Sequence, residues 1–355
     1  MSLAAWEPGG LGPAVLRSSG VRALNGRTQG TQSLQFFPGG DRVAVAEMNR
    51  GACSVWEAGT GRLLRVLLPS PTVYRRVLEV RVFPAGDRVI ALVADGTAVI
   101  WHVASGRQLC RFEVGGHRIV RVFPDGARLL TGVARSGSDL AVVWDTMGGL
   151  LHRLRQPEGE IRLMDLSPCG ARAVTAMAFA SSIFLWDATD GRLVATLPAA
   201  SRGLLALAAS RHAATVLGVM SDRLEVWDGR NASRPPLAIP MKAFGVGILL
   251  GDGDRVVSVS PVEAVVWDAA SGRRLTTLHG DHAGAGGTAE RIAASSGGEV
   301  AAACGNRRGA SWVTVWHTLT GQVLHSSDTF HGAWRWSLCS LAVRPFPSMA
   351  GTIQR

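Results

Sequence analysis

Short apolar runs recur along the chain and are separated by polar turns at nearly constant intervals. Residues 77–112 show one unit: Val77–Phe83 alternates between apolar and polar positions, and Arg88–Ala94 is almost continuously apolar. Thr97–Val103 and Arg107–Phe112 are two further runs of similar length. Turns rich in Pro, Gly and Asp divide the four runs. Runs of this length and period predict β-strands, so the unit predicts four antiparallel strands joined by tight turns.

A tryptophan stands near the end of the third run in each unit. The seven tryptophans are separated by 45, 43, 42, 41, 40 and 49 residues, and they are Trp56, Trp101, Trp144, Trp186, Trp227, Trp267 and Trp316. A period of about 40–45 residues ending in Trp-Asp is typical of a four-stranded propeller blade. We therefore expect blades at about 30–68, 77–112, 117–154, 161–197, 203–240, 244–278 and 288–326. Each tryptophan is expected to fill the space between adjacent sheets and to need a polar partner for its indole N–H.

The details of these units resemble the WD-repeat family of β-propellers. The Trp-Asp pair stands at 144–145, 186–187, 227–228 and 267–268, and Gly116-His117 and Asp95 match two further family positions. The resemblance covers residues 30–326 and implies an all-β, seven-bladed propeller of four-stranded antiparallel blades. Residues 1–29 and 327–355 then flank the propeller. A narrower resemblance, to the C-terminal propeller arrays of NACHT-type NTPases, implies a sensing module.

Partial repeats near both ends leave the number of blades open. Trp6 followed by Ala14-Val15-Leu16 looks like the tail of a further repeat, and Ser337–Val343 looks like an inner strand. Three arrangements remain: a seven-bladed ring with flanking strands, an eight-bladed ring whose last blade joins both termini, or part of a tandem propeller.

The formal net charge of +10 comes almost entirely from arginine, since Lys242 is the single lysine among 37 basic residues. Many arginines follow the glycine of a blade turn, as in GTGR, ASGR and TDGR. Repeated around a ring, they predict a basic rim, which we interpret as solvated turn residues rather than a nucleic-acid surface. The start of the chain lacks a signal-peptide pattern, and no apolar run is long enough to span a membrane. We expect a cytoplasmic protein, with the nucleus as the alternative.

Motifs for catalysis and metal binding are weak in this sequence. The five cysteines are scattered without a C-x-x-C pair, so neither a disulfide framework nor a zinc site is indicated. The sequence holds no P-loop and no G-x-S-x-G element. His279-Gly280-Asp281-His282 is the best metal-like cluster, but it lacks a fourth ligand at a usual spacing. We predict no catalytic, cofactor-binding or metal-binding residues and no enzyme activity.

These observations favour a non-catalytic scaffold or sensing module that binds other proteins. Blade loops offer the contacts, and the irregular segments at about 69–76 and 279–287 and the arginine-bearing turns are the regions to search. One alternative is a substrate receptor, because Trp227-Asp228-Gly229-Arg230 matches the box with which some WD-repeat proteins dock to the adaptor of cullin-type ubiquitin ligases. There Asp228 and Arg230 would make the contact. A basic propeller that binds nucleic acid is the second alternative.

Overall fold

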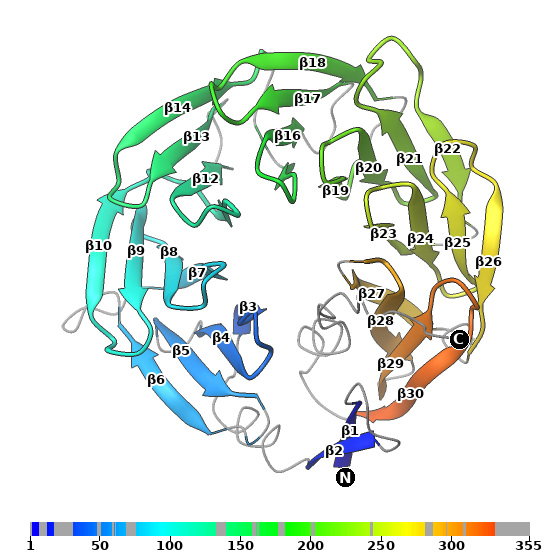
Figure 1. Cartoon of the computed structure of the whole chain (residues 1–355), viewed down its shortest axis with the longest axis horizontal. Coiled ribbons are helices and arrows are strands. Elements are labelled where there is room, and N and C mark those ends of the chain that lie inside the picture. Colours follow the sequence, from blue (N-terminus) through cyan, green and yellow to red (C-terminus); the bar gives the residue numbers. More distant parts are fainter. Residues whose placement is uncertain are drawn as a thin grey trace, which may run out of the picture.

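The chain is described by a computed structural model in which seven four-stranded antiparallel sheets stand around a ring (Figure 1). The structure describes residues 2–6, 13–17, 31–47, 51–58, 60, 62–68, 76–132, 140–157, 161, 163–176, 182–199, 203–241, 244–280, 287–295, 297–307 and 310–330. The described residues include no helix with the length and hydropathy that a membrane span requires.

The strands of the first four sheets are β3 (Thr31–Phe36), β4 (Arg42–Glu47), β5 (Ala52–Glu57) and β6 (Leu63–Leu67); β7 (Val77–Val82), β8 (Arg88–Val93), β9 (Thr97–His102) and β10 (Gln108–Glu113); β11 (Ile119–Val122), β12 (Arg128–Gly132), β13 (Leu140–Asp145) and β14 (Leu150–Arg155); β15 (Leu163–Leu166), β16 (Arg172–Ala176), β17 (Ser182–Asp187) and β18 (Leu193–Pro198). Those of the last three are β19 (Ala206–Ala209), β20 (Thr215–Val219), β21 (Arg223–Asp228) and β22 (Leu237–Pro240); β23 (Val246–Leu250), β24 (Arg255–Val259), β25 (Ala264–Asp268) and β26 (Arg274–Leu278); β27 (Gly287–Ala294), β28 (Val300–Arg307), β29 (Ala310–His317) and β30 (Val323–Phe330).

Within every sheet the strands lie side by side in chain order. The first strand of each sheet is innermost in the ring and the fourth is outermost (Figure 1). The four strands predicted for residues 77–112 are confirmed, although the fourth begins and ends one residue later than expected. A register shift between Gln108 and Cys110, opposite Trp101, accompanies this difference. The shift is a bulge that starts the outer strand after its turn.

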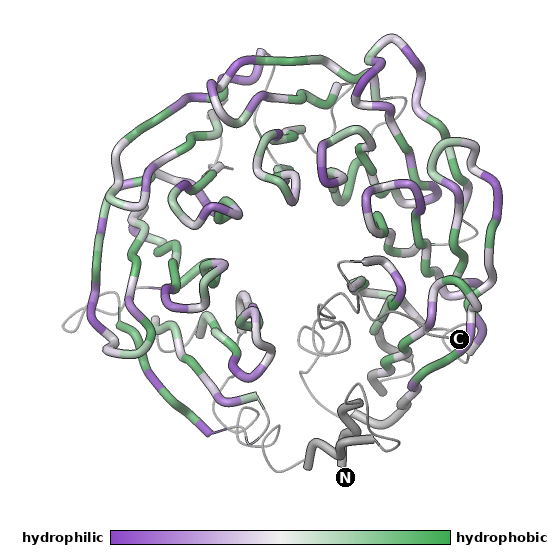
Figure 2. Tube along the Cα trace, in the orientation of Figure 1, coloured by the Kyte–Doolittle hydropathy of each residue, from purple (hydrophilic) through white to green (hydrophobic). Residues whose placement is uncertain are grey.

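The hydrophobic core is divided into layers between neighbouring sheets. One apolar cluster joins the first and second sheets, another the third and fourth, and a third the sixth and seventh. The second strand of a sheet is buried on both faces after its first residue, as in β8 and β16, which explains its continuous apolar sequence. Apolar residues recur within the strands, whereas many polar residues lie at the turns (Figure 2). Each sheet therefore depends on its neighbours for burial.

The described residues leave the ring open between the first and the seventh sheet (Figure 1). Contacts between neighbouring sheets otherwise run in order from the first sheet to the seventh, largely through the innermost strands. A separate two-stranded antiparallel sheet is formed by β1 (Ser2–Trp6) and β2 (Pro13–Arg17). The architecture is thus an all-β, propeller-like repeat.

Most of the repeated tryptophans are buried between sheets. Trp56, Trp101, Trp186, Trp227 and Trp316 are at most 3 % exposed, and the other two are half-buried. In four sheets the indole N–H donates to a Ser or Thr hydroxyl of the same sheet, at 2.7 to 2.9 Å. Trp227 and Trp316 instead donate across to the preceding unit, to the carbonyl oxygens of Pro198 and His279, each at 2.6 Å. The expected polar partner is therefore present in these six cases.

Replacing Trp227 by Ala should lower the free energy of unfolding by about 3–5 kcal/mol, because it opens a cavity in the layer between sheets. It also leaves the Pro198 carbonyl without its donor. Trp186→Ala should have a similar effect. Thermal and urea unfolding measure both changes. Met147→Ala, at a side chain that is 73 % exposed, is the control and should be neutral. Unchanged stability of Trp227→Ala would contradict its role in packing.

Candidate functional site

The turns of the sheets are divided between two faces of the ring. Turns between first and second strands and between third and fourth strands share one face, where Val103 N donates to Asp87 O at 2.8 Å. We call this the turn face. Turns between second and third strands and the connections between sheets share the other face, where Val114 N donates to Gly96 O at 2.8 Å. We call this the connection face.

On the turn face, the aspartates of the Trp-Asp pairs hold the tight turns in shape. Their Oδ1 atoms accept backbone N–H groups within the turn; the donors are Met147 for Asp145, Thr189 for Asp187, Arg230 for Asp228 and Ser271 for Asp268, at 2.8 to 2.9 Å. Partial burial would raise the pKa of Asp187, but hydrogen bonds from Thr189 and Arg172 outweigh it and lower that pKa to about 2. These carboxylates therefore have a structural role, because their Oδ1 atoms accept backbone hydrogen bonds that stabilise the turns.

The structure brings the two candidate docking residues together at one turn. Asp228 Oδ1 accepts the backbone N–H of Arg230 at 2.9 Å, and the Arg230 side chain is exposed on the turn face. The carboxylate therefore fixes the turn, and the guanidinium group is accessible to solvent.

The metal-like cluster is described only at its first two residues. His279 is exposed and uses its backbone carbonyl for Trp316, while Asp281 and His282 lie outside the described residues. Where the chain is described, no three His, Cys, Asp or Glu side chains lie close enough together to hold a metal ion. The four cysteines within that part of the chain form no disulfide with one another.

Some turn arginines have structural partners that sequence reasoning missed. In the first three sheets the arginine of the repeated Phe-Pro-x-Gly-x-Arg string stacks on its own phenylalanine; the pairs are Arg42 with Phe37, Arg88 with Phe83 and Arg128 with Phe123, at 4.4, 4.2 and 4.3 Å from the ring centroid. Arg88 Nη2 also donates to Gly126 O of the next sheet at 2.8 Å. The Phe-Pro-x-Gly-x-Arg pattern recurs in these three sheets, and this recurrence was the sequence signal that could have predicted the stacked pairs.

The arginines that follow the turn glycines occupy one equivalent place. These residues, Arg62, Arg107, Arg192 and Arg273, are all exposed and directly precede the outermost strand on the turn face. The predicted basic rim thus has its members on one side of the ring. Acidic residues share three of these four turns, those before Arg62, Arg192 and Arg273, and Arg62 pairs with Glu57 at 3.4 Å. The local charge is therefore partly balanced.

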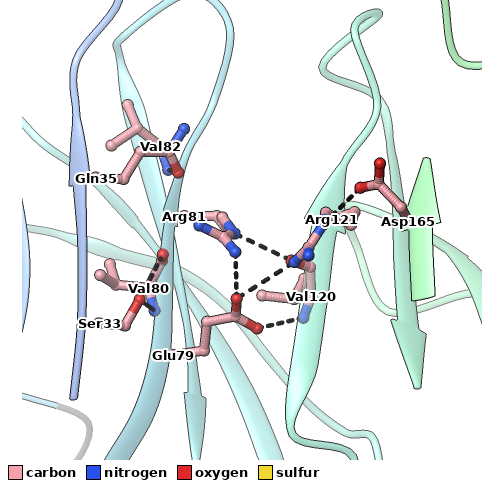
Figure 3. A network of polar contacts seen from close by, with 9 residues as sticks. All are labelled: Ser33, Gln35, Glu79, Val80, Arg81, Val82, Val120, Arg121 and Asp165. Carbon is pink, nitrogen blue, oxygen red and sulfur yellow. Dashed lines mark hydrogen bonds and ion pairs between the residues drawn. The ribbon is translucent and has the colours of Figure 1, made fainter. Parts of the chain in front are cut away.

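A network of charged side chains crosses the innermost strands of three sheets (Figure 3). Glu79 Oε2 accepts Val120 N at 2.6 Å, and Arg81 Nε donates to Val120 O at 3.2 Å. Arg121 then lies 3.4 Å from Glu79 and 3.3 Å from Asp165. Two guanidinium groups balance two carboxylates, and all four side chains are engaged. The network joins sheets and offers no uncompensated charge to a ligand.

The connection face contains a hollow of about 360 Å³ beside the second and third sheets. Its lining comes from the connection before β7, the turn between β8 and β9 and the connection before β11. The lining residues are Arg76, Leu78, Val93, Ala94, Gly96, Gly115, Gly116, His117 and Arg118. Arg76 is the last residue of the irregular segment 69–76 that the sequence singled out; residues 69–75 lie outside the described residues.

His117 is the buried member of this lining. Its Nδ1 lies 2.7 Å from Thr131 Oγ1, which accepts the indole N–H of Trp144, also at 2.7 Å. Burial lowers the pKa of His117 to about 4, so the imidazole is neutral at pH 7. Positive charge in the hollow therefore comes from the exposed residues Arg76 and Arg118.

Exposed apolar side chains also occur on the connection face, in the fifth and sixth sheets. Leu205 precedes β19, Phe244 precedes β23, and Val262 lies in the turn between β24 and β25. They are 49 %, 63 % and 51 % exposed, respectively. Sequence reasoning missed all three, because single apolar residues in loops carry no pattern.

Comparisons with known proteins support the architecture. No family model matches the chain. The chain is similar to the computationally designed Ika8 protein, with a TM-score of 0.66 and 19 % identity over 86 % of this chain and 89 % of the designed chain. That likeness shows the fold alone. Over 171 residues, 44 % of the chain, it is 32 % identical to centriole proteome protein 16 of Chlamydomonas reinhardtii. The match spans 8 % of that protein's length.

Stability should fall on acidification through His117. Its pKa in the folded protein lies below the ordinary value of 6.5, so protonation favours the unfolded chain. The stabilisation is complete above about pH 6.5 and is lost as the pH falls towards 4, by up to about 3 kcal/mol. Unfolding of wild type and His117→Asn over pH 4 to 8 measures this, and the variant should show the smaller slope. His212→Gln, at an exposed histidine, is the control. Equal slopes in all three proteins would exclude His117 as the cause.

Proposed function

We propose that the chain is a WD-repeat β-propeller that serves as a non-catalytic scaffold or sensing module and binds other proteins through its connection face. The seven consecutive sheets, the tryptophan at the same place in each and the His117–Thr131–Trp144 contact support the family assignment.

The pairing register of the hairpin β1–β2 favours a ring of eight units over a closed ring of seven units. Trp6 pairs with Pro13, seven residues later. The third and fourth strands of the sheets pair in the same register, since Trp101 lies opposite Gln108 and Trp186 opposite Leu193. β1–β2 thus has the register of an outer strand pair, and the ring is open where another sheet would stand. A ring closed by this hairpin would cover the faces that the first and seventh sheets turn towards the opening.

Replacing residues 1–29 by a Gly-Ser segment of equal length should lower the Tm by more than about 5 °C if β1–β2 belongs to the ring, because an inter-sheet layer is lost. Differential scanning calorimetry of both proteins measures the change. An unchanged Tm would contradict the eight-unit arrangement and favour a seven-unit ring.

The exposed apolar residues of the connection face carry the binding proposal. Leu205, Phe244 and Val262 belong to two successive sheets and stand on the same face as the hollow. Aromatic and aliphatic residues on a rigid support are the usual anchors of protein interfaces. By contrast, Asp145 and Asp187 on the turn face bind backbone groups of their own turns, and Arg88 stacks on Phe83. The arginine content therefore does not require a nucleic-acid partner.

Phe244→Asp should weaken partner capture by more than about tenfold, because a central anchor in an interface contributes about 2 kcal/mol or more. Affinity purification with quantitative mass spectrometry compares wild type with the variant, and the Kd of a recovered partner is then measured directly.

Met147→Asp is the matched control, since Met147 is more exposed than Phe244 but lies on the turn face. It should leave capture unchanged. If wild type captures nothing, or if both variants lose the same partners, the connection face is not the binding surface.

A further inference from the structure

We propose that the hollow on the connection face binds the carboxylate side chains of an acidic peptide segment in a partner protein. The inference rests on the proposed protein-binding function and adds the chemistry of the partner. It follows from three properties of the hollow: its charge, its backbone wall and its apolar floor.

The hollow has positive charge and no negative charge in its lining. Arg76 and Arg118 each contribute a guanidinium group, and none of the nine lining residues is acidic. The nearest carboxylate in sequence, that of Asp95, is already bound by Arg111 at 2.9 Å and by Thr97. Within the described residues Arg118 takes part in no ion pair. A guanidinium group matches a carboxylate with two parallel hydrogen bonds, so an acidic side chain would fit here.

One wall of the hollow consists of backbone. Gly96 and Gly115 both have positive φ, 88° and 67°. A Cβ on Gly96 would stand 2.7 Å from Gly115 O, so the two segments touch closely, and Val114 N donates to Gly96 O at 2.8 Å. A Cβ on Gly115, however, would meet no atom within 4 Å. The wall is therefore fixed by Gly96, while Gly115 leaves space for the main chain of a ligand.

The remaining lining favours a peptide over a phosphate-rich polymer. Leu78 and Ala94 provide apolar surface beside the two arginines, whereas Val93 is 1 % exposed and contributes little. A volume of about 360 Å³ lies at the small end of ligand sites and accommodates one or two side chains. Glutamate next to leucine or valine would use both the charge and the apolar surface. A phosphodiester backbone would use the charge alone.

The test uses two labelled peptides, one of alternating Glu and Leu and one in which Gln replaces every Glu. Fluorescence anisotropy with the full chain should show at least tenfold tighter binding of the Glu peptide. Arg118→Ala should weaken that binding about tenfold. Arg118→Lys should recover it in part, because an ammonium group keeps the charge but loses the fork. Arg107→Ala, at an exposed arginine of the turn face, should bind as wild type does.

Equal binding of the two peptides, or wild-type affinity in Arg118→Ala, would overturn the proposal. Inorganic phosphate is the competing probe: if it displaces the Glu peptide more effectively than acetate does, the hollow is a phosphate site and the carboxylate assignment is wrong. Thermal unfolding confirms that Arg118→Ala is folded. Partners captured through Phe244 without binding of the Glu peptide would leave the scaffold function standing and remove this inference alone.

Discussion

The unpaired inner edge of each first strand is the constraint on which this architecture depends. An innermost strand pairs with another strand on one side only. The N–H and C=O groups along its free edge therefore need hydrogen-bond partners outside the sheet. In the first sheets these partners are side chains of the preceding sheet. Gln35 accepts Val82 N at 2.9 Å, Glu79 accepts Val120 N at 2.6 Å, and Asp165 accepts Ala209 N at 3.3 Å. The same hydrogen bonds that satisfy an edge therefore join one sheet to the next.

This arrangement also explains where charge can be buried. Glu79 is nearly buried, and an isolated carboxylate there would be strongly destabilising. It is bound by a backbone N–H and lies beside Arg81 and Arg121, so the charge is compensated within the network. The positions equivalent to Glu79 in the fifth and sixth sheets are Ala206 and Val246. Apolar layers join early and late sheets alike, and the charged network across the innermost strands is an addition to that packing in the second, third and fourth sheets.

The sequence alone predicted the repeated four-stranded unit but not the hollow on the connection face, and the reasons are physical. Strand period, turn residues and the Trp spacing are local, so the four strands of residues 77–112 were predicted to within one residue. The partners of Arg88 and Glu79 lie about 40 residues away, and only the stacking of sheets brings them together. The hollow likewise combines three separate connections. Arg76 lay in the irregular segment 69–76 that the sequence singled out, but no pattern distinguished Arg118 from the other arginines of the chain.

The turn face and the connection face differ in how their side chains are used by the fold. On the turn face, Asp187 and Asp228 accept backbone N–H groups and Arg128 stacks on Phe123. These polar side chains therefore stabilise the conformation of their turns. On the connection face, Phe244 is exposed to solvent, and so are Arg76 and Arg118, which line the hollow. The sheets are joined by hydrogen bonds at the inner edge and by contacts on the turn face. Exposed residues of the connections can therefore be substituted without loss of core packing. We therefore propose that binding specificity resides in exposed connection residues such as Phe244, and not in buried ones such as His117, which the fold requires.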